Sequence, residues 1–509
     1  MDIVKNTLQY YMPGMEYVNS FEEETMAIVP DTQQDMLCVN LCSGSIDVQE
    51  RSIVKDTVRI AGVVNCVAVY SPVEGDNLGV LETSIPFSYT VDLKDIGEND
   101  RVVIDSKLIN LSASMVNPRK LNAKARIEIC SKVFKFCSNE YIEDIVSAKD
   151  EGINCLSSCD KIDPISYIAE KKIVINDEIR VNNPDLNDTS IIIAQENRWI
   201  NEDVKVLTNK IMVRGRIEIE ISAISKEGKF IGKSRYSVPT SQMIECEGLR
   251  SEDKVEICYI PSREEVKIFT ESDNTSNIEI SFAAQTVCLV RQEIEITSVK
   301  DVFSTYYDLV SESFDLGMLK RNEETIAEKE IDDKVILESH PLKIVHISAV
   351  CERMPVAKNE RVAEAAIQLN IIYLDEDHTV RSEIKRICTE IKLPDAFIND
   401  GWCRVECSEV TAVPGDDEKV TVSSKIKAFT EKTVDGTSVV AECILDRNRP
   451  RHLNEKASMI IRRSNKEERF WDIAKKYGIS PYAVASANKA DVLDIPEQGR
   501  MLLIPMVRQ

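Results

Sequence analysis

The feature that most constrains the fold of this chain is a long internal repeat, visible in residues with special backbone conformations. Four such residues recur 153 positions later with no gap between them: Gly62, Gly75, Gly79 and Pro86 correspond to Gly215, Gly228, Gly232 and Pro239. Glycine and proline positions are dictated by turns and close backbone approaches, so their joint recurrence indicates a duplicated fold. Solenoid units are about 20–50 residues long, so this longer period predicts self-sufficient domains that follow one another along the chain.

Alternation of apolar and polar residues accompanies the repeat and predicts half-buried strands. The clearest run is Ile211–Ile221, which leads into a glycine turn at Lys226–Lys229, and Val58–Cys66 is its earlier counterpart. A third copy follows 150 residues after the second, with Ala365 in place of Gly215 and the turn Asp375–His378. Its matching residues are Val356, Asn359, Ile367, Ile371, Val405 and Glu406, after Val206, Asn209, Ile217, Ile221, Val255 and Glu256. Short β-branched runs between turn residues predict a β-sandwich or barrel in each copy.

Charge is distributed unevenly along the chain. The formal net charge is −23, from 63 basic and 86 acidic side chains, which argues against nucleic acid as a partner because a polyanion would be repelled. From Arg447 to Gln509 there are 13 basic and 7 acidic residues, a net of +6, so residues 1–446 carry −29. A basic C-terminal segment therefore follows an acidic body, which indicates two different roles along one chain.

The cysteines and the termini indicate a cytoplasmic protein. The fifteen cysteines are odd in number and lie mostly in apolar runs such as Thr286–Val290, which favours free thiols over a disulfide framework. Residues Met1–Thr7 contain no basic stretch leading into an apolar core, and the late apolar run Met501–Val507 is interrupted by Pro505. We therefore expect neither export nor a transmembrane segment.

Residue patterns typical of catalysis or metal binding are scarce. None of the four histidines has a cysteine or carboxylate at metal-ligand or nucleophile–base spacing; His346 is expected in a core and His378 in a turn. Three C-x-x-x-C pairs could hold zinc, but buried small hydrophobic residues are the favoured interpretation of Cys38/Cys42, Cys155/Cys159 and Cys403/Cys407. No phosphate loop, dinucleotide fingerprint, nucleophile elbow or zinc-protease motif occurs. We expect no catalytic residue, no metal and no cofactor.

The C-terminal segment predicts a very small domain. Met459–Arg463 has the pattern of a strand, and residues 470–478 that of a helix ended by Gly478. Ser480 and Pro481 are typical of the start of a second helix, which is expected to run to Asn488. A turn and a strand over Pro496–Pro505 complete the order strand, helix, helix, strand.

This segment resembles a LysM module in the runs W-D-I-A-K-K-Y-G-I-S, A-N and Q-G-R-M-L-L-I-P. The resemblance implies binding of N-acetylglucosamine-containing glycans beside the first strand-to-helix turn, where the family has Gly-Asp-Thr. This chain has Lys466-Glu467-Glu468-Arg469 there, which replaces a close backbone approach by bulky charged side chains. The sequence therefore leaves glycan binding in doubt.

A LysM module after β repeats of this length, in an acidic chain, is similar to the SipL-like clostridial spore-coat morphogenetic proteins, whose repeats form the SPOCS family. The resemblance implies a non-enzymatic mother-cell protein that binds the spore-coat morphogenetic ATPase and other coat proteins, is recruited to the forespore surface and supports coat assembly. In that family the LysM module contacts a protein. Self-association through the repeats is a further expectation.

The predicted fold is mainly β, with three tandem sandwich or barrel-like SPOCS repeats and a small βααβ LysM domain. The predicted domains are residues 1–146, 165–299, 300–446 and 455–509, separated by the polar stretch Ser147–Pro164, a point near Lys300 and the linker Arg447–Asn454. These boundaries follow from the repeat period and from polar, proline-bearing composition.

Residues of the C-terminal module are the candidates for partner binding. Trp471 is the proposed anchor because large amphipathic rings are typical of interfaces, although it could equally belong to the module's own core. The surrounding basic candidates are Arg462, Arg463, Lys466 and Lys475. Two alternatives remain open, namely a peptidoglycan- or cortex-binding LysM protein, and a hydrolase that would need a pair of carboxylates not found in the sequence.

Overall fold

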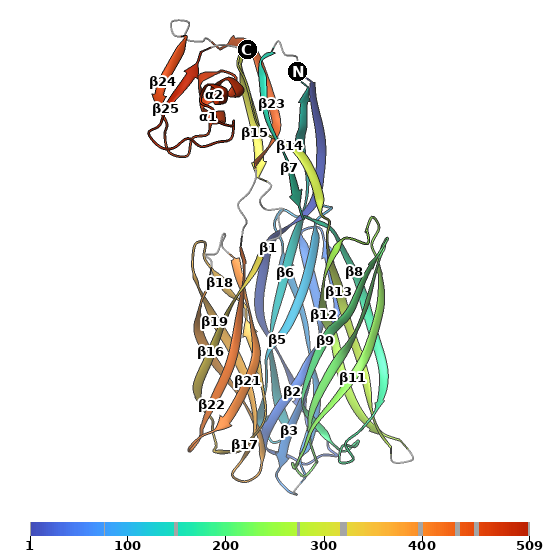
Figure 1. Cartoon of the computed structure of the whole chain (residues 1–509). Coiled ribbons are helices and arrows are strands. Elements are labelled where there is room, and N and C mark those ends of the chain that lie inside the picture. Colours follow the sequence, from blue (N-terminus) through green and yellow to red (C-terminus); the bar gives the residue numbers. More distant parts are fainter. Residues whose placement is uncertain are drawn as a thin grey trace.

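The computed structural model describes residues 2–75, 77–146, 151–271, 275–315, 323–394, 401–432, 438–451 and 458–506. Within these ranges the chain is built almost wholly of strands, and its two short helices lie near the C-terminus (Figure 1). The expected mainly β fold is confirmed. The strands form three β bodies, a narrower stalk above them and a small C-terminal module.

The first body consists of two facing three-stranded sheets. The order in one is β2–β3–β4, with bounds Met36–Val54, Thr57–Pro72 and Gly79–Asp92. The order in the other is β1–β6–β5, with bounds Asp2–Ile28, Lys120–Val146 and Arg101–Asn117. Strand β3 buries Val58, Ile60, Val64 and Cys66, as its alternation predicts, and these side chains face the core between the sheets.

The second body has the same strand order. One sheet is β9–β10–β11, with bounds Ile191–Leu207, Lys210–Ile224 and Phe230–Glu245. The other is β8–β13–β12, with bounds Ile165–Arg180, Ser276–Arg291 and Lys254–Thr270. The single residue pair Tyr11↔Ile165 joins this second sheet to β1, so it forms one six-stranded sheet with β1–β6–β5 of the first body.

The third body repeats the order again with shorter strands. One sheet is β17–β19–β20, with bounds Pro341–Glu352, Val362–Asp375 and Val380–Lys392. The other is β16–β22–β21, with bounds Glu323–Ile336, Lys419–Lys432 and Gly401–Pro414, and the short β18 (Met354–Val356) adds to its edge.

The structure shows why glycine occurs at two positions of the repeat, Gly228 and Gly215. Gly228 has a φ of 78°, and His378 holds the matching turn of the third body at a φ of 57°, so histidine there accepts the backbone conformation that glycine favours. At Gly215 a Cβ atom would lie 2.1 Å from the Ile200 carbonyl oxygen of the neighbouring strand. The corresponding Ala365 is tolerated because β17 has already ended, with its last pair at Glu352↔Ala366.

The stalk is made of one two-stranded ribbon from each body. The ribbons are the outer halves of β1 and β6, the pair β7 (Ile153–Ile162) and β14 (Ile294–Ser304), and the pair β15 (Tyr307–Asp315) and β23 (Ser438–Pro450). They lie side by side above the bodies (Figure 1). Their shared core includes Tyr141, Ile142, Ile296, Val299, Val439 and Val440. Each body thus contributes to a common structure that buries apolar residues from all three.

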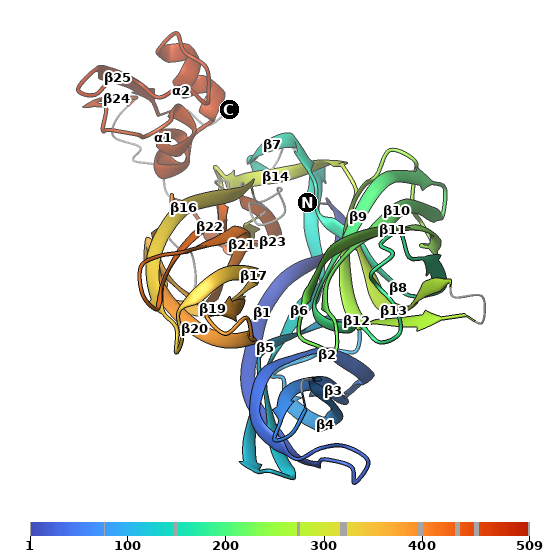
Figure 2. The ribbon, with the colours of Figure 1, turned by 90° about the horizontal axis from the view of Figure 1, so that it is seen from below.

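The bodies also share an interior with one another. Seen from below, they lie at the corners of a triangle (Figure 2). One buried cluster between them draws on all three bodies: Leu41, Val69, Ile191, Ile193, Ile224, Val345, Ile372 and Val380. A polar contact lies at each interface: the ion pairs Asp47–Arg263 at 2.9 Å and Arg126–Glu352 at 3.1 Å, and the contact of Glu196 with the His346 ring at 3.4 Å. The bodies are therefore packed around a common centre.

The stretches expected as boundaries are largely structured. Residues 153–162 of the expected linker Ser147–Pro164 form strand β7, and the point near Lys300 lies inside β14. The expected last linker lies partly in β23, which ends at Pro450, and partly outside the described residues. These stretches carry polar side chains because each ribbon has one face directed to solvent.

The C-terminal module has the expected order of elements. Strand β24 (Met459–Arg463) pairs antiparallel with β25 (Met501–Pro505), and helices α1 (Phe470–Tyr477) and α2 (Pro481–Ala487) lie between them in sequence. Helix α1 ends at Gly478, which adopts the left-handed conformation with a φ of 65°. The buried amide of Asn488 donates to the Val484 and Leu503 carbonyls, which ties α2 to β25.

Candidate partner-binding site

The module's largest candidate residue, Trp471, is buried against the stalk. Its side chain is 2% exposed, and its indole N–H donates to the Asp301 carboxylate at 2.7 Å. Phe303 of β14, which is 1% exposed, packs edge-on against the indole with ring centroids 5.1 Å apart. Trp471 therefore contacts a distant part of its own chain, and in this arrangement its ring is covered.

Lys475, one helical turn later, joins the same contact. Its ammonium group lies 2.6 Å from the second oxygen of the Asp301 carboxylate, so one carboxylate engages both residues of α1. Arg451, which directly follows stalk strand β23, donates to the Lys475 carbonyl and pairs with Asp308. The edge of α1 that holds two predicted partner residues thus faces the stalk.

The remaining basic candidates lie on β24 and in the turn that follows it. Arg462 is largely buried, pairs with Glu468 and lies over the ring of Tyr477 at 5.9 Å. Arg463 on β24 is exposed, and Lys466 is exposed beside Glu467 at 3.9 Å. The five candidates therefore do not form one patch: two face the stalk, one is held within the module, and two face solvent.

The turn Lys466–Arg469, where LysM modules have Gly-Asp-Thr, keeps a backbone conformation that glycine favours. Glu467 has a left-handed φ of 67°. The next residue, Glu468, is folded back onto Arg462, and their side chains are only 17% and 14% exposed. An ion pair therefore occupies the space beside this turn.

An exposed apolar face on β24 and β25 was not predicted from the sequence. Ile461 is 58% exposed and pairs with the exposed Leu503 across the two strands, while Met459 and Met501 lie at the neighbouring exposed positions. Leu493 and Ile495, in the loop before β25, are also exposed. We call Met459, Ile461, Met501 and Leu503, which lie on the two paired strands, the apolar face. Its signal in the sequence is that Met459–Ile461 and Met501–Ile504 are unbroken apolar runs, so each strand has apolar residues on both faces although only one face can be internal.

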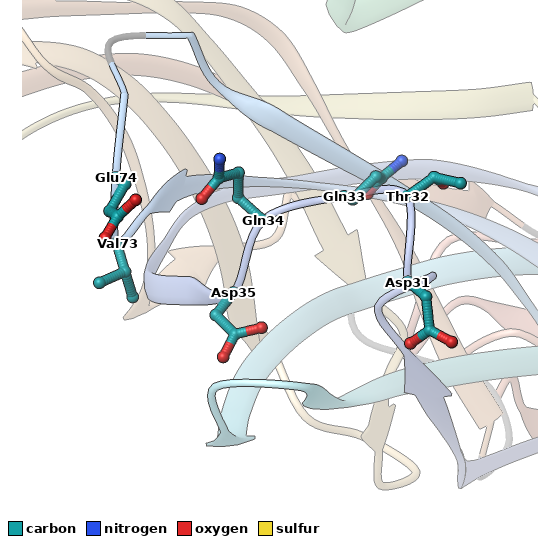
Figure 3. A pocket seen from close by; sticks show the side chains of 7 residues that line it. All are labelled: Asp31, Thr32, Gln33, Gln34, Asp35, Val73 and Glu74. Atoms are coloured by element: carbon teal, nitrogen blue, oxygen red, sulfur yellow. The ribbon is translucent and has the colours of Figure 1, made fainter.

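Elsewhere the described surface offers little that could bind a small molecule. A shallow hollow of about 420 Å³ lies at the far end of the first body, lined by Asp31, Thr32, Gln33, Gln34, Asp35, Val73 and Glu74. Their side chains point along and away from the loop without converging on one point (Figure 3). Arg119 pairs with both Asp31 and Asp35. The hollow is thus a charged loop surface.

Two negative findings concern the described ranges only. In them, no group of three or more histidine, cysteine or acidic residues is placed to hold a metal ion. In the same part of the chain, no helix has the length and apolar character needed to cross a membrane.

Of the paired cysteines, Cys42 and Cys403 are buried, Cys38, Cys155 and Cys407 are half-buried, and Cys159 is exposed.

Comparison with known proteins identifies the first body. The family model described as "SipL, SPOCS domain" matches residues 35–116, which comprise β2 to β5. No significant match was found to a curated protein or to a solved structure. SipL proteins are a non-catalytic sporulation family. The expected resemblance to SipL-like proteins is thus confirmed over residues 35–116 of the first body, which carry a SPOCS domain.

Proposed function

We propose that this protein is a non-enzymatic adaptor of spore-coat assembly that binds the coat morphogenetic ATPase through its C-terminal module. In this proposal the module is a LysM domain, and the second and third bodies are further SPOCS repeats. The protein acts in the mother-cell cytoplasm and is recruited by its partner to the forespore surface. The SPOCS match supports a sporulation role, and the recurring strand order supports the assignment of all three bodies.

The observation that carries the proposal is the apolar face. Four large apolar side chains are exposed on the two paired strands of a module of about fifty residues, and exposed apolar groupings of this kind mark protein interaction sites. Arg463 lies on the same strand as Met459 and Ile461 and adds positive charge at its end. An apolar centre with a charged edge is typical of a protein interface.

The module's turn favours a protein partner over a glycan. Sugars bind LysM modules next to the strand-to-helix turn, where backbone must be accessible. In this chain Glu467 and the Arg462–Glu468 ion pair occupy that region. Because charged side chains occupy this turn, the apolar face is the favoured binding surface of the module.

The three bodies would serve as a rigid multivalent platform. Their shared interior holds them in fixed relative positions, so other coat proteins, or further copies of this chain, would meet several sites in one geometry. Weak sites presented together gain effective concentration, so none of them needs high affinity.

The test is binding of the purified ATPase to the full chain with Ile461→Glu. A charge at the centre of the apolar face should lower affinity by roughly a hundredfold, equivalent to about 3 kcal/mol. The matched control is Val310→Glu, which changes a β-branched residue that is 67% exposed on the stalk. Thermal unfolding of both variants should match that of the unchanged protein, because neither side chain is buried.

Equal binding by the two variants would contradict the proposed site. Retention of the unchanged protein on peptidoglycan or chito-oligosaccharide, together with absence of ATPase binding, would instead establish the glycan-binding alternative.

A further inference from the structure

The contact between the stalk and the module centres on two residues of β14, Asp301 and Phe303, and is joined by Leu156 of β7 and by Arg451. Asp301 accepts from the Trp471 indole and pairs with Lys475, and Phe303 belongs to the same buried cluster as Phe470, Ile473 and the rest of the module's core. We call Asp301 and Phe303 the mount. It lies about 170 residues away in sequence from the α1 residues that it holds.

A β-bulge gives the mount its orientation. Val299 pairs with Ser157 and Asp301 pairs with Leu156, so Lys300 is an extra residue in β14. Val299 and Val302 are both buried in the stalk core although they are three residues apart, a spacing that a regular strand would direct to opposite faces. The bulge therefore leaves Asp301 and Phe303 together on the side of the module. Lys300 itself is 2.6 Å from Asp160 on the partner strand.

The mount holds the module with its apolar face outward. Helices α1 and α2 lie on the side of the module that is directed toward the stalk, and β24 and β25 lie on the outer side (Figure 1). Figure 2 shows the same order from below, with β24 and β25 farthest from the three bodies. Helix α1, which touches the mount, and strands β24 and β25, which carry the apolar face, thus lie on opposite sides of the module.

We propose that the mount fixes the orientation of the module, so that the apolar face meets its partner in one preset direction. This inference rests on the proposed binding of the ATPase by the apolar face. A module fixed before binding loses less orientational freedom on association than one that swings on a linker, and preorganisation of this kind increases affinity. Asp301 and Phe303 are positioning residues, because they act on the partner through the module.

The test uses the full chain with Asp301→Ala, which removes both the indole acceptor and the lysine counter-charge. Amide hydrogen exchange in α1 should increase, and affinity for the purified ATPase should fall roughly fivefold or more. Asp301→Asn keeps an acceptor for the indole and should give a smaller loss. Glu442→Ala removes an exposed stalk carboxylate that does not contact the module and is the matched control. Thermal unfolding of the bodies should be unchanged in all three variants.

A double-mutant cycle separates this role from general damage. Trp471→Phe keeps a ring in the module core but loses the N–H that Asp301 accepts, so it should weaken ATPase binding in the same direction. Combined with Asp301→Ala it should add less than the sum of the two single losses, because both remove one interaction.

Three results would overturn the proposal: unchanged exchange in α1, unchanged affinity once α1 is released, or tighter binding by Asp301→Ala, which would show that the mount masks the partner site. If the unchanged protein does not bind the ATPase at all, the adaptor function fails, whereas exchange in α1 still decides whether the mount holds the module.

Discussion

The interface among the three bodies and the interface between the stalk and the module differ in how many apolar residues they bury. The three bodies share an apolar interior, a common stalk core and a polar contact at each interface, whereas the stalk and module meet mainly at the mount. Parts that share an extensive interface unfold together, whereas parts that share a small interface can unfold separately. We therefore expect one cooperative unit formed by the bodies and stalk, and a module with its own stability. The predictions below test this difference.

The largest expected effect comes from the interior shared by the bodies. Ile193 is fully buried there, so Ile193→Ala should lower the free energy of unfolding by roughly 2–5 kcal/mol through lost contacts and a residual cavity. Because the cluster joins all three bodies, hydrogen exchange should increase in the first and third bodies as well as in the second. An increase confined to Ile165–Arg291 would show that the bodies are independent.

A pH-dependent effect is expected at the interface of the second and third bodies. Burial, followed by the nearby Lys233, lowers the pKa of His346 to about 4, although Glu196 lies 3.4 Å from its ring. The unfolded chain binds the proton near pH 6.5 and the folded chain does not, so stability present above pH 6.5 is lost as the pH falls toward 4. The shift corresponds to about 3 kcal/mol.

Denaturant unfolding of His346→Leu at pH 7 and pH 4.5 measures this contribution. The loss of stability between the two pH values should be smaller than in the unchanged protein. His378→Gln, which changes a histidine in an exposed turn, should keep the full loss. An identical pH dependence in all three proteins would contradict the assignment to His346.

Much of the local structure could be predicted from the sequence, but the interfaces between the parts of the molecule could not. Alternation predicts strand β3 because Val58 and Ile60 must face a core, and Gly478 predicts the end of α1 because only the left-handed region closes it there. Alternation shows which face of a strand is buried, not what covers it. Strand β7 was therefore assigned to a linker, since Ser157, Ser158 and Asp160 gave it a polar composition.

The candidate site was predictable to the same extent. Trp471 is recognisable in the sequence as a buried or interfacial ring, but its acceptor Asp301 is about 170 residues distant and carries no local pattern. Arg463 and Lys466 are exposed as a binding surface requires, whereas Arg462 is held by Glu468. The sequence predicts both strands of the apolar face, but it does not show which of their apolar residues are left exposed.

Asn488 tests whether the module unfolds separately. Its buried amide makes three hydrogen bonds, two as donor and one as acceptor from the Leu503 N–H, so Asn488→Ala should cost the module roughly 1–3 kcal/mol. Hydrogen exchange should rise across α1, α2 and β25 while the bodies keep their protection. Loss of protection in the bodies would show that the mount transmits instability.

The smallest effect is expected at the end of α1. Gly478→Ala places a Cβ atom on a left-handed residue and should destabilise the module by about 1 kcal/mol. Gly97→Ala, at a loop glycine of the first body whose φ is outside the left-handed region, is the matched control. Equal effects of the two changes on amide hydrogen exchange in α1 would contradict the assignment of Gly478 as the residue that stabilises the end of this helix.

Hydrogen exchange of the full chain with and without the purified ATPase tests the central claim most directly. The adaptor account predicts new protection in β24 and β25, with α1 protected equally in the free and bound states because the mount already holds it. Protection confined to the three bodies, or increased exchange in α1 on binding, would contradict the account.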